Sequence, residues 1–320
     1  MGKILVIGAG GQLGTELTKA LANKHGNEAV IATDFQESAS SKFEYCAFQP
    51  LNIMDKEALA SVVKKEGVSQ VYHLAAILSA LGEKNPVQAW DLNMGGLLNV
   101  LEVAREYKID KVFWPSSIAV FGPHSDKDHT PQKSFKDPNT VYGISKLAGE
   151  HWCEYYFNKY GVDVRSVRFP GLIGYKSMAG GGTTDYAVDI YHKAVQSEKF
   201  ECFLSEHTYL PMMYMDDAIN ATIQLMEAPM ENISIRTSYN ISGMSFSPEE
   251  IYQSLLTYFP TFEIEYKPDF RQQIADSWPS SIDDSYAKND WNWQPTFDLK
   301  AMTAIIIKNL PQYFHYNEIK

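Results

Sequence analysis

The feature that most constrains the fold is a glycine-rich turn between an apolar run and a helical pattern. Residues 3–7 read Lys-Ile-Leu-Val-Ile, and glycines follow at positions 8, 10, 11 and 14. A helical pattern continues to about residue 23, and a second apolar run over 28–33 ends at Asp34. A strand, a crossover helix and a second strand in this order predict a parallel β-pair with the glycines at its carboxyl edge.

The same alternation recurs along the first half of the chain. Apolar runs lie at 70–74, 111–114 and 163–169, and helical patterns lie at 56–65, 87–107 and 141–160. This alternation predicts an α/β fold with a Rossmann-type doubly wound parallel sheet that helices cover on both faces. After residue 170 the pattern is less regular, and further helices are predicted at 185–196, 215–226, 248–258 and 299–310.

The spacing Gly8-x-x-Gly11-x-x-Gly14 suits a dinucleotide. Glycines permit a tight turn, close approach of the backbone to a pyrophosphate, and close packing of helix on strand. Asp34 follows Gly14 by 20 residues and is placed to accept hydrogen bonds from a ribose diol, while its charge would repel a 2′-phosphate. No Arg or Lys lies between Asp34 and Ser41, so NAD is favoured over NADP. The alternatives are a turn that only starts a helix and a carboxylate that only caps a strand.

A cofactor of this size needs more of the sheet edge than one turn, so residues after later strands are also assigned to it. The residues predicted to bind NAD are Gly8, Gly11, Gln12, Leu13, Gly14, Asp34, Asn52, Ile53, Leu74, Ala75, Ala76, Asn93, Tyr142, Lys146 and Pro170.

The predicted helix at 141–160 begins with a tyrosine and a lysine that share one face. Tyr142 and Lys146 are four residues apart, so the ammonium is expected near the phenol. A nearby positive charge lowers the pKa of an acid, which makes Tyr142 a candidate general base. Ser116 and Ser117 stand where the strand at 111–114 breaks into a loop, and sheet topology is expected to deliver them near Tyr142. The alternative is an ordinary solvated tyrosine–lysine pair.

These segments resemble the extended short-chain dehydrogenase/reductase family, whose catalytic triad is Ser or Thr, Tyr and Lys. The resemblance implies Ser117, Tyr142 and Lys146 as the triad, with Ser116 as the alternative hydroxyl. Within the family, the chain is most similar to the L-threonine 3-dehydrogenases of the short-chain type. The segments that carry this similarity are 114–123, 168–174, 180–186, 209–217, 271–279 and 283–285.

This resemblance implies the reaction and the substrate. The expected reaction is NAD-dependent oxidation of the 3-hydroxyl of L-threonine to 2-amino-3-oxobutanoate, with Tyr142 as base. Several of the substrate residues have structural alternatives. Thr183 and Thr184, beside three glycines, also suit an ordinary loop, Asp185 also suits a helix N-cap, and Trp278 also suits core packing. The residues expected to contact the substrate are Ser79, Ser117, Tyr142, Thr183, Thr184, Asp185 and Trp278.

Two other functions compete with this one. A nucleotide-sugar epimerase or dehydratase of the same family shares the fold, the cofactor and the triad. Such enzymes usually carry an arginine for the sugar nucleotide's diphosphate near the position of Tyr209-Leu-Pro211, where this chain has no cation. The other competitor is an NAD-sensing scaffold without catalysis, which an intact Ser117, Tyr142 and Lys146 argue against.

The cofactor and substrate assignments divide the chain. Residues 1–172 are predicted to form the NAD-binding Rossmann domain, and 206–233 are expected to return to it. Residues 173–205 and 234–320 are expected to form a smaller C-terminal cap that binds substrate. No linker or low-complexity tract separates the two parts, so the cap is expected to fold onto the sheet.

Composition excludes several partners and locations. A formal net charge of −11 disfavours nucleic acid and anionic membranes. Three widely spaced cysteines without a Cys-x-x-Cys motif argue against a disulfide framework and a metal site and favour a reducing cytoplasm. No leader sequence or membrane-spanning run is expected. The helices predicted at 86–107 and 141–160 pair across a two-fold axis in the resembling family, which implies a homodimer.

Overall fold

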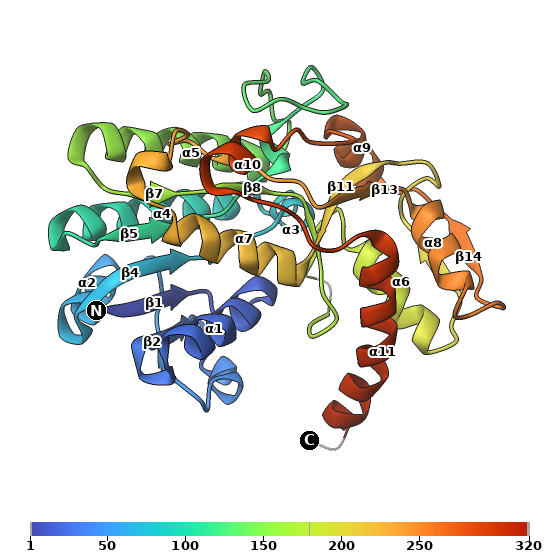
Figure 1. The fold of residues 1–320 in the computed structure, drawn as a ribbon, viewed down its shortest axis with the longest axis horizontal. Coiled ribbons are helices and arrows are strands. Elements are labelled where there is room, and N and C mark those ends of the chain that lie inside the picture. The colour runs from blue at the N-terminus through green and yellow to red at the C-terminus, as the bar shows by residue number, and fades with distance from the viewer. Residues whose placement is uncertain (1, 179, 319–320) are drawn as a thin grey trace.

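The computed structural model describes residues 2–178 and 180–318, and its centre is a six-stranded parallel sheet (Figure 1). Every neighbouring pair of strands in this sheet is parallel. The predicted Rossmann-type α/β fold is therefore confirmed. In spatial order the strands are β3 (Ala47–Pro50), β2 (Val30–Asp34), β1 (Lys3–Ile7), β4 (Val68–His73), β5 (Lys111–Phe113) and β7 (Val164–Arg165).

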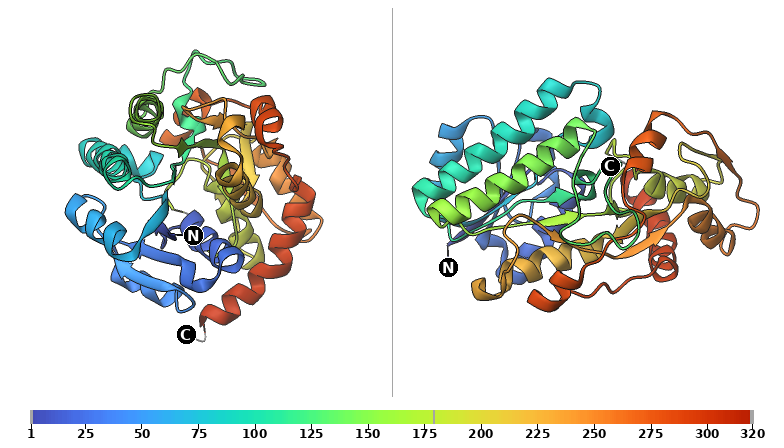
Figure 2. Two further views of the ribbon diagram at one scale, coloured as in Figure 1. Left: turned by 60° about the vertical axis from the view of Figure 1, so that its left-hand side comes forward. Right: turned by 90° about the horizontal axis from the view of Figure 1, so that it is seen from above.

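Strand β1 is apolar along its length because both faces of the sheet are buried. Ile4 and Val6 belong to the core beneath helix α1, whereas Leu5 packs in the core on the opposite face, as the two-residue period of a strand requires. Helices α1 (Gln12–His25) and α7 (Met215–Glu227) cover the first face. The other face carries α2 (Lys56–Glu66), α4 (Pro86–Tyr107) and α5 (Val141–Tyr160), and the last two lie side by side (Figure 2).

The predicted strand at 163–169 is two strands. It bends at Ser166, so that β7 stays in the main sheet while β8 (Val167–Phe169) joins a second sheet between β6 (Ser116–Ser117) and β12 (Tyr239–Asn240). Short helical segments complete this part of the molecule: η1 (Asn27–Ala29), η2 (Glu37–Lys42), α3 (Ser79–Gly82), η3 (Ile118–Val120) and η4 (Met230–Asn232).

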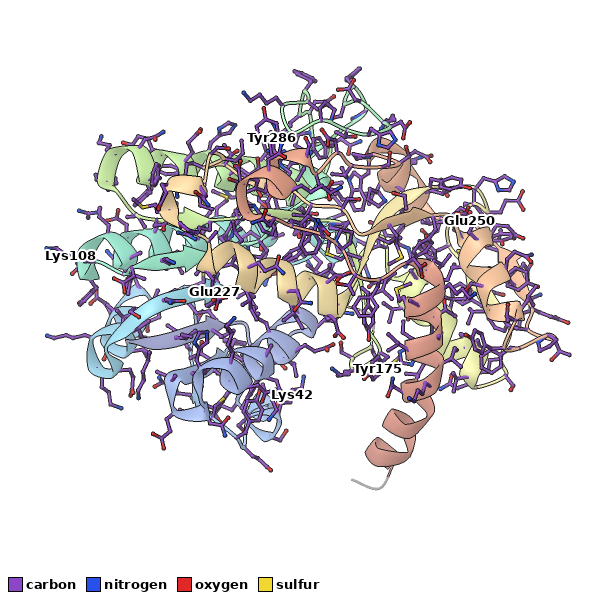
Figure 3. All side chains as sticks on the ribbon, viewed as in Figure 1. Lys42, Lys108, Tyr175, Glu227, Glu250 and Tyr286 are labelled. Carbon is purple, nitrogen blue, oxygen red and sulfur yellow. The ribbon has the colours of Figure 1, made fainter. Side chains whose placement is uncertain are left out.

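The cap has its own hydrophobic core. Its buried residues include Tyr191, Met212 and Ile251, and the Tyr191 hydroxyl lies 2.8 Å from the Thr303 hydroxyl. Lys108 on the sheet side and Glu250 in the cap lie toward opposite ends of the molecule (Figure 3). The cap elements are β9 (Gly171–Ile173), α6 (Tyr186–Val195), β10 (Phe200–Cys202), β11 (Leu210–Tyr214), β13 (Met244–Phe246), α8 (Pro248–Leu256), β14 (Ile264–Tyr266), α9 (Phe270–Ser277) and α11 (Leu299–Glu318).

The predicted cap segment 234–320 is not continuous in space. Strand β12 pairs with β8, and helix α10 (Ser285–Trp291) packs beside β12 on the core that also contains β1. The rings of Tyr239 and Trp291 meet edge to face with centroids 5.9 Å apart. These two elements belong with the sheet rather than the cap. A two-residue strand has too little periodicity to reveal its partner in the sequence.

Two further observations bear on environment. Among the described residues, no helix combines the length and apolar character that crossing a bilayer requires. Cys46, Cys153 and Cys202 are all free thiols.

Candidate active site

The glycine turn after β1 is held in place by contacts that exclude side chains. The N–H groups of Gly8 and Ala9 both donate to Thr33 O, at 3.0 and 2.9 Å. Gly8 has φ of +79°, and a Cβ there would lie 2.6 Å from Ala75 N. A Cβ on Gly14 would lie 2.3 Å from Gly8 O. Glycine is therefore required at both positions by the protein itself.

Gly11 differs from its neighbours because the protein leaves space beside it. A Cβ built on Gly11 meets nothing closer than Gly8 O at 3.5 Å, which is an ordinary contact. Gly11 also lines two adjoining cavities at the carboxyl edge of the sheet. A bare backbone at this point lets a ligand approach the N-terminus of α1 closely, as a pyrophosphate does.

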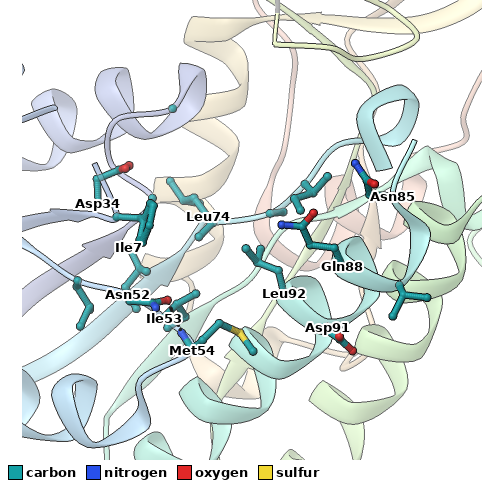
Figure 4. A pocket seen from close by; sticks show the side chains of 18 of the residues that line it. Ile7, Asp34, Asn52, Ile53, Met54, Leu74, Asn85, Gln88, Asp91 and Leu92 are labelled. Atoms are coloured by element: carbon teal, nitrogen blue, oxygen red, sulfur yellow. Dashed lines mark hydrogen bonds between the residues drawn. The ribbon is translucent and has the colours of Figure 1, made fainter. Parts of the chain in front are cut away.

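A cavity of about 980 Å³ opens at the carboxyl edge of the sheet (Figure 4). Asp34 lies on one side of it, and Asn85 and Gln88 lie on the other. The Asp34 carboxylate accepts hydrogen bonds from Gly10 N at 2.9 Å and Gln36 N at 3.0 Å. Each oxygen keeps a free lone pair for a further donor, which suits recognition of a ribose diol. Other residues predicted to bind the cofactor also line this cavity: Gly8, Gly11, Asn52, Ile53, Leu74, Ala75 and Ala76.

A second cavity of about 250 Å³ adjoins the first and shares Gly8, Gly11, Leu74 and Ala76 with it. The two cavities therefore form one continuous site, with a large compartment and a small one. Helix α5, the glycine turn and the cap all contribute to the small compartment. Its lining contains the remaining predicted residues apart from Asn93, namely Gln12, Leu13, Gly14, Ser79, Ser117, Tyr142, Lys146, Pro170, Thr183, Thr184, Asp185 and Trp278.

Asn93 lines neither cavity. Its side-chain oxygen accepts from Ile77 N at 2.8 Å, and its amide donates to Ile77 O at 3.1 Å. Ile77 in turn lines the large cavity. Asn93 thus holds the loop after β4 in position, because both of its polar groups are already used by that backbone.

The start of α5 brings Tyr142 against the loop that follows Ser117. Thr140 caps the helix by accepting a hydrogen bond from Gly143 N at 3.1 Å. A Cβ on Gly143 would lie 2.1 Å from Ala119 O, so only glycine permits this approach. As a result the Ser117 hydroxyl lies beside Tyr142 in the small cavity and acts to lower the pKa of the phenol.

Lys146 lies behind the tyrosine ring rather than at its hydroxyl. Its ammonium donates to Pro115 O at 2.6 Å and lies 5.5 Å from the centroid of the Tyr142 ring. Burial lowers the pKa of Lys146 to about 7, and burial raises the pKa of Tyr142 to about 12 against the opposing effect of the Ser117 hydrogen bond. The pKa of Tyr142 is therefore raised by burial, and the only opposing influence is the neighbouring Ser117 hydroxyl.

The structure distinguishes the two serines. Adjacent residues of a strand point to opposite sides, so Ser116 turns toward the interior, where its hydroxyl donates to Glu150 Oε1 at 2.7 Å. Ser117 turns toward Tyr142 and accepts from Ala119 N at 3.2 Å. Ser117 is therefore the hydroxyl placed beside the phenol.

The polar residues of the cap side meet the helix α3 region across the small cavity. The hydroxyls of Ser79 and Thr183, 104 positions apart in sequence, lie 3.2 Å from each other. Asp185 stands at the N-cap position of α6, but its side chain accepts no hydrogen bond from that helix. The carboxylate instead accepts hydrogen bonds from Gly181 N and Gly182 N of the preceding loop, at 2.7 Å each. Trp278 is 6% exposed and belongs to the cap core while it also lines the cavity, so its two predicted roles coexist.

Several residues that line the large cavity have no motif in the sequence. Phe35 directly follows Asp34 and is 74% exposed, an unusual position for an aromatic side chain unless a ligand covers it. An aromatic residue directly after Asp34 could therefore have indicated, from the sequence, a further contact with the cofactor. The other unpredicted lining residues include Met54, Asn85, Gln88 and Asp91.

The doubly wound sheet, the glycine turn and the Ser–Tyr–Lys cluster together define an NAD-dependent oxidoreductase of the Rossmann type. The profile of the NAD dependent epimerase/dehydratase family matches residues 4–242, and the chain belongs to that family. The predictions of the family and of NAD as cofactor are thereby confirmed.

Individual proteins are similar over nearly the whole chain. An uncharacterized epimerase/dehydratase of Staphylococcus saprophyticus is 49% identical over 309 residues, which cover 96% of each chain. The holo structure of a GalE-like L-threonine dehydrogenase from Cupriavidus necator is 55% identical with a TM-score of 0.94, covering 96% of this chain and 99% of that one. A monomeric L-threonine 3-dehydrogenase from a metagenome database is 50% identical with a TM-score of 0.93, covering 97% and 99%.

Proposed function

We propose that this protein oxidises the 3-hydroxyl of L-threonine to 2-amino-3-oxobutanoate with NAD. The observation that carries the proposal is the small cavity, where the Tyr142 phenol and the Ser117 hydroxyl lie in one compartment with the hydroxyls of Ser79 and Thr183. A compartment of about 250 Å³ suits a small amino acid beside the reactive end of a cofactor. The similarity to L-threonine dehydrogenases supports the same substrate.

The residues of the small cavity divide the chemistry between them. Tyr142 as phenolate takes the proton of the substrate hydroxyl, and Ser117 donates a hydrogen bond to the oxygen as it becomes a carbonyl. Lys146, held by Pro115 O, lies beside Tyr142 and is positioned to reach the cofactor's ribose. Bound NAD supplies the acceptor for the hydride that leaves the same carbon.

The carboxylate and ammonium groups of an amino acid need opposite partners. Ser79, Thr183 and Thr184 provide hydroxyl donors for the carboxylate. Asp185 lines the same cavity and keeps lone pairs beyond those used by the two glycine N–H groups, which suits an ammonium. Burial raises the pKa of Asp185, and a bound ammonium would favour its charged form.

A sugar-nucleotide epimerase or dehydratase is the competing function, and the name of the family includes it. Sugar-nucleotide enzymes of this family usually bind the substrate's diphosphate with an arginine. Arg271, on the cap, is already bidentate to Asp269 at 2.7 and 3.0 Å and stacks on Phe203. The segment 209–211 has no basic residue. These features favour the amino acid over the sugar nucleotide.

A substrate panel tests the proposal. Purified protein with NAD at a pH near 9 is expected to produce NADH with L-threonine, with much less from L-serine and none from UDP-galactose, measured by absorbance. UDP-galactose is also assayed for conversion to UDP-glucose, which an absorbance assay would miss. Epimerisation without threonine oxidation would contradict the proposal, and silence in every assay would favour a non-catalytic scaffold.

Lys127 is expected to influence substrate affinity through Trp278. Its ammonium donates to Asp276 O at 3.0 Å and Trp278 O at 3.3 Å, which ties the Trp278 segment to the loop after Ser117. Lys127→Met should raise KM for L-threonine by up to about tenfold, the value of one charged hydrogen bond, with kcat nearly unchanged. Steady-state kinetics measure both. The exposed Lys133→Met is the control, and an unchanged KM in Lys127→Met would contradict the expectation.

We also propose a homodimer and a cytoplasmic location. Helices α4 and α5 expose apolar side chains along adjacent faces, and such a surface suits burial against a second copy. The free state of all three cysteines accords with a reducing compartment. The exposed side chains are Val87 (73%), Trp90 (39%), Ile144 (46%), Trp152 (39%) and Tyr155 (42%).

The dimer has a direct test. Light scattering is expected to give twice the chain mass of 36.1 kDa, and Trp152→Glu is expected to give the single mass because a charge would be buried in the interface. Phe270→Glu, a change at an exposed aromatic residue on α9 (53% against 39% for Trp152), is expected to leave the dimer intact. A single mass for the unmodified protein would place it with the monomeric metagenome enzyme instead.

A further inference from the structure

Three consecutive residues after β5 each contact a different residue on one side of α5. Pro115 O accepts from Lys146 Nζ at 2.6 Å, and the Ser116 hydroxyl donates to Glu150 Oε1 at 2.7 Å. Ser117 then lies beside Tyr142 in the small cavity. Because Tyr142, Lys146 and Glu150 are spaced by four, they project from one side of the helix. The strand segment is thus fixed to the helix by two successive hydrogen bonds, and the next residue faces the phenol.

Glu150 is itself fixed by a buried arginine. Both side chains are 1% exposed, and Arg168 donates to both Glu150 oxygens at 2.8 and 2.7 Å. Arg168 also donates to Asn240 Oδ1 at 2.9 Å and to Gln132 O at 3.1 Å. In the ladder between β6 and β8, Arg168 is the register partner of Ser116. The carboxylate therefore has a fixed position relative to the strand that carries Ser117.

We propose that Glu150 is a positioning residue for the reaction: it holds Ser116, and through it Ser117, in register with Tyr142, and it keeps a negative charge near Lys146. This inference rests on the proposed function for its kinetic readout. The groups that face Lys146 are Tyr142, Glu150 and Cys153 on α5, His73 on β4, and the Trp114 ring 4.5 Å away. Burial lowers the pKa of His73 to about 3 and raises that of Cys153, so both are neutral at neutral pH and Glu150 is the carboxylate in this group.

Glu150→Gln tests the proposal because it removes the charge and nearly keeps the shape. We expect kcat for L-threonine to fall about tenfold or more, the size of effect that a small displacement of catalytic groups produces, with KM and the Kd of NAD within about twofold. We also expect the rising limb of the kcat–pH profile, which reports loss of one proton from the Tyr142–Lys146 pair, to move to lower pH, because that pair loses a neighbouring anion that favours its protonated form. Glu150→Asp, which keeps the charge, should retain the limb of the unmodified protein.

Two variants separate this role from general stability. Asp163→Asn removes a carboxylate from another buried ion pair, with Arg165, at the opposite edge of the sheet, and should leave kcat and the pH profile unchanged. Ser116→Ala removes only the hydroxyl that Glu150 accepts, and should lower kcat without moving the limb. If Glu150→Gln does not fold, Ser116→Ala tests the proposal in its place. A kcat of Ser116→Ala equal to that of the unmodified protein would overturn the proposal.

A substrate-free readout distinguishes failure of this inference from failure of the proposed function. The Cε resonance of Lys146, in protein labelled with 13C-lysine and assigned with Lys146→Met, should titrate at lower pH in Glu150→Gln than in the unmodified protein. If the unmodified protein ignores L-threonine but this shift is seen, the substrate assignment fails and the role of Glu150 near Lys146 stands. If folded Glu150→Gln matches the unmodified protein in titration and in kcat, the proposal is overturned.

Discussion

Tyr142→Phe is expected to lower kcat for L-threonine oxidation by about 10²–10⁴-fold, the range that loss of a general base produces. The substitution removes only the phenolic oxygen, so the packing of the ring against the small cavity is retained. The Kd of NAD, measured by calorimetry, should therefore change little. This combination assigns the loss to the proton transfer rather than to binding.

The same variant has a pH signature. Burial raises the pKa of Tyr142 to about 12, and the base works only when deprotonated, so kcat/KM of the unmodified protein is expected to rise with pH across the alkaline range. Because Tyr142 and Lys146 are neighbours, the rise reports loss of one proton from the pair. The residual activity of Tyr142→Phe should lack this rise.

A second tyrosine provides the control. Tyr175 follows β9 and lines neither the large nor the small cavity (Figure 3). Tyr175→Phe is expected to keep kcat within about twofold, since it removes a hydroxyl that touches no reacting group. A Tyr142→Phe enzyme as active as Tyr175→Phe would rule out the proposed base.

Gly11→Ala is expected to weaken NAD binding by about 10- to 100-fold while the folded protein remains as stable as before. The added methyl meets only Gly8 O at 3.5 Å within the protein, but it projects where both cavities meet. Overpacking a close contact costs about 1–3 kcal/mol, which corresponds to that loss of affinity. Calorimetry with NAD measures the affinity, and denaturant unfolding measures the stability.

The opposite pattern is expected at a glycine far from the cofactor. Gly161 ends α5 with φ of +72° and has nothing within 4 Å of a built Cβ. Gly161→Ala should lower the free energy of unfolding by about 1–2 kcal/mol, the cost of a left-handed conformation for alanine, and leave NAD affinity unchanged. Normal NAD binding by Gly11→Ala would mean that the pyrophosphate does not approach this backbone.

The chain's local patterns were sufficient to predict the parallel sheet. Strand β1 is apolar because both of its faces are buried, and α1 follows a glycine turn whose geometry admits no side chain at Gly8 or Gly14. Tyr142 and Lys146 are recognisable for the same reason, since their spacing of four on α5 is a local property. The strand-to-loop break pointed to Ser116 and Ser117 together, and resemblance to a family chose Ser117 and added Thr183 and Trp278.

Other features depend on contacts between distant segments, and sequence periodicity does not contain them. Strand β12 lies in the segment predicted to form the cap, yet it pairs with β8. Its two residues are too few to show an alternation of apolar and polar side chains that would indicate this pairing. Asn93 remains a predicted cofactor residue, and in the structure its side chain bonds the backbone of Ile77, a contact that no local pattern reveals. Met54 and Gln88 line the large cavity only because the loops that carry them meet there.

The sequence by itself determined the class of fold, the glycine turn and the tyrosine–lysine pair, because each of these follows from residues within one turn, strand or helix. Only the tertiary structure decided that Ser117 rather than Ser116 faces Tyr142. The two side chains point to opposite sides of the strand, and the Ser116 hydroxyl donates to Glu150. It also decided the direction of both pKa shifts at the site, because desolvation depends on everything packed around a group: burial raises the pKa of Tyr142 and lowers that of Lys146.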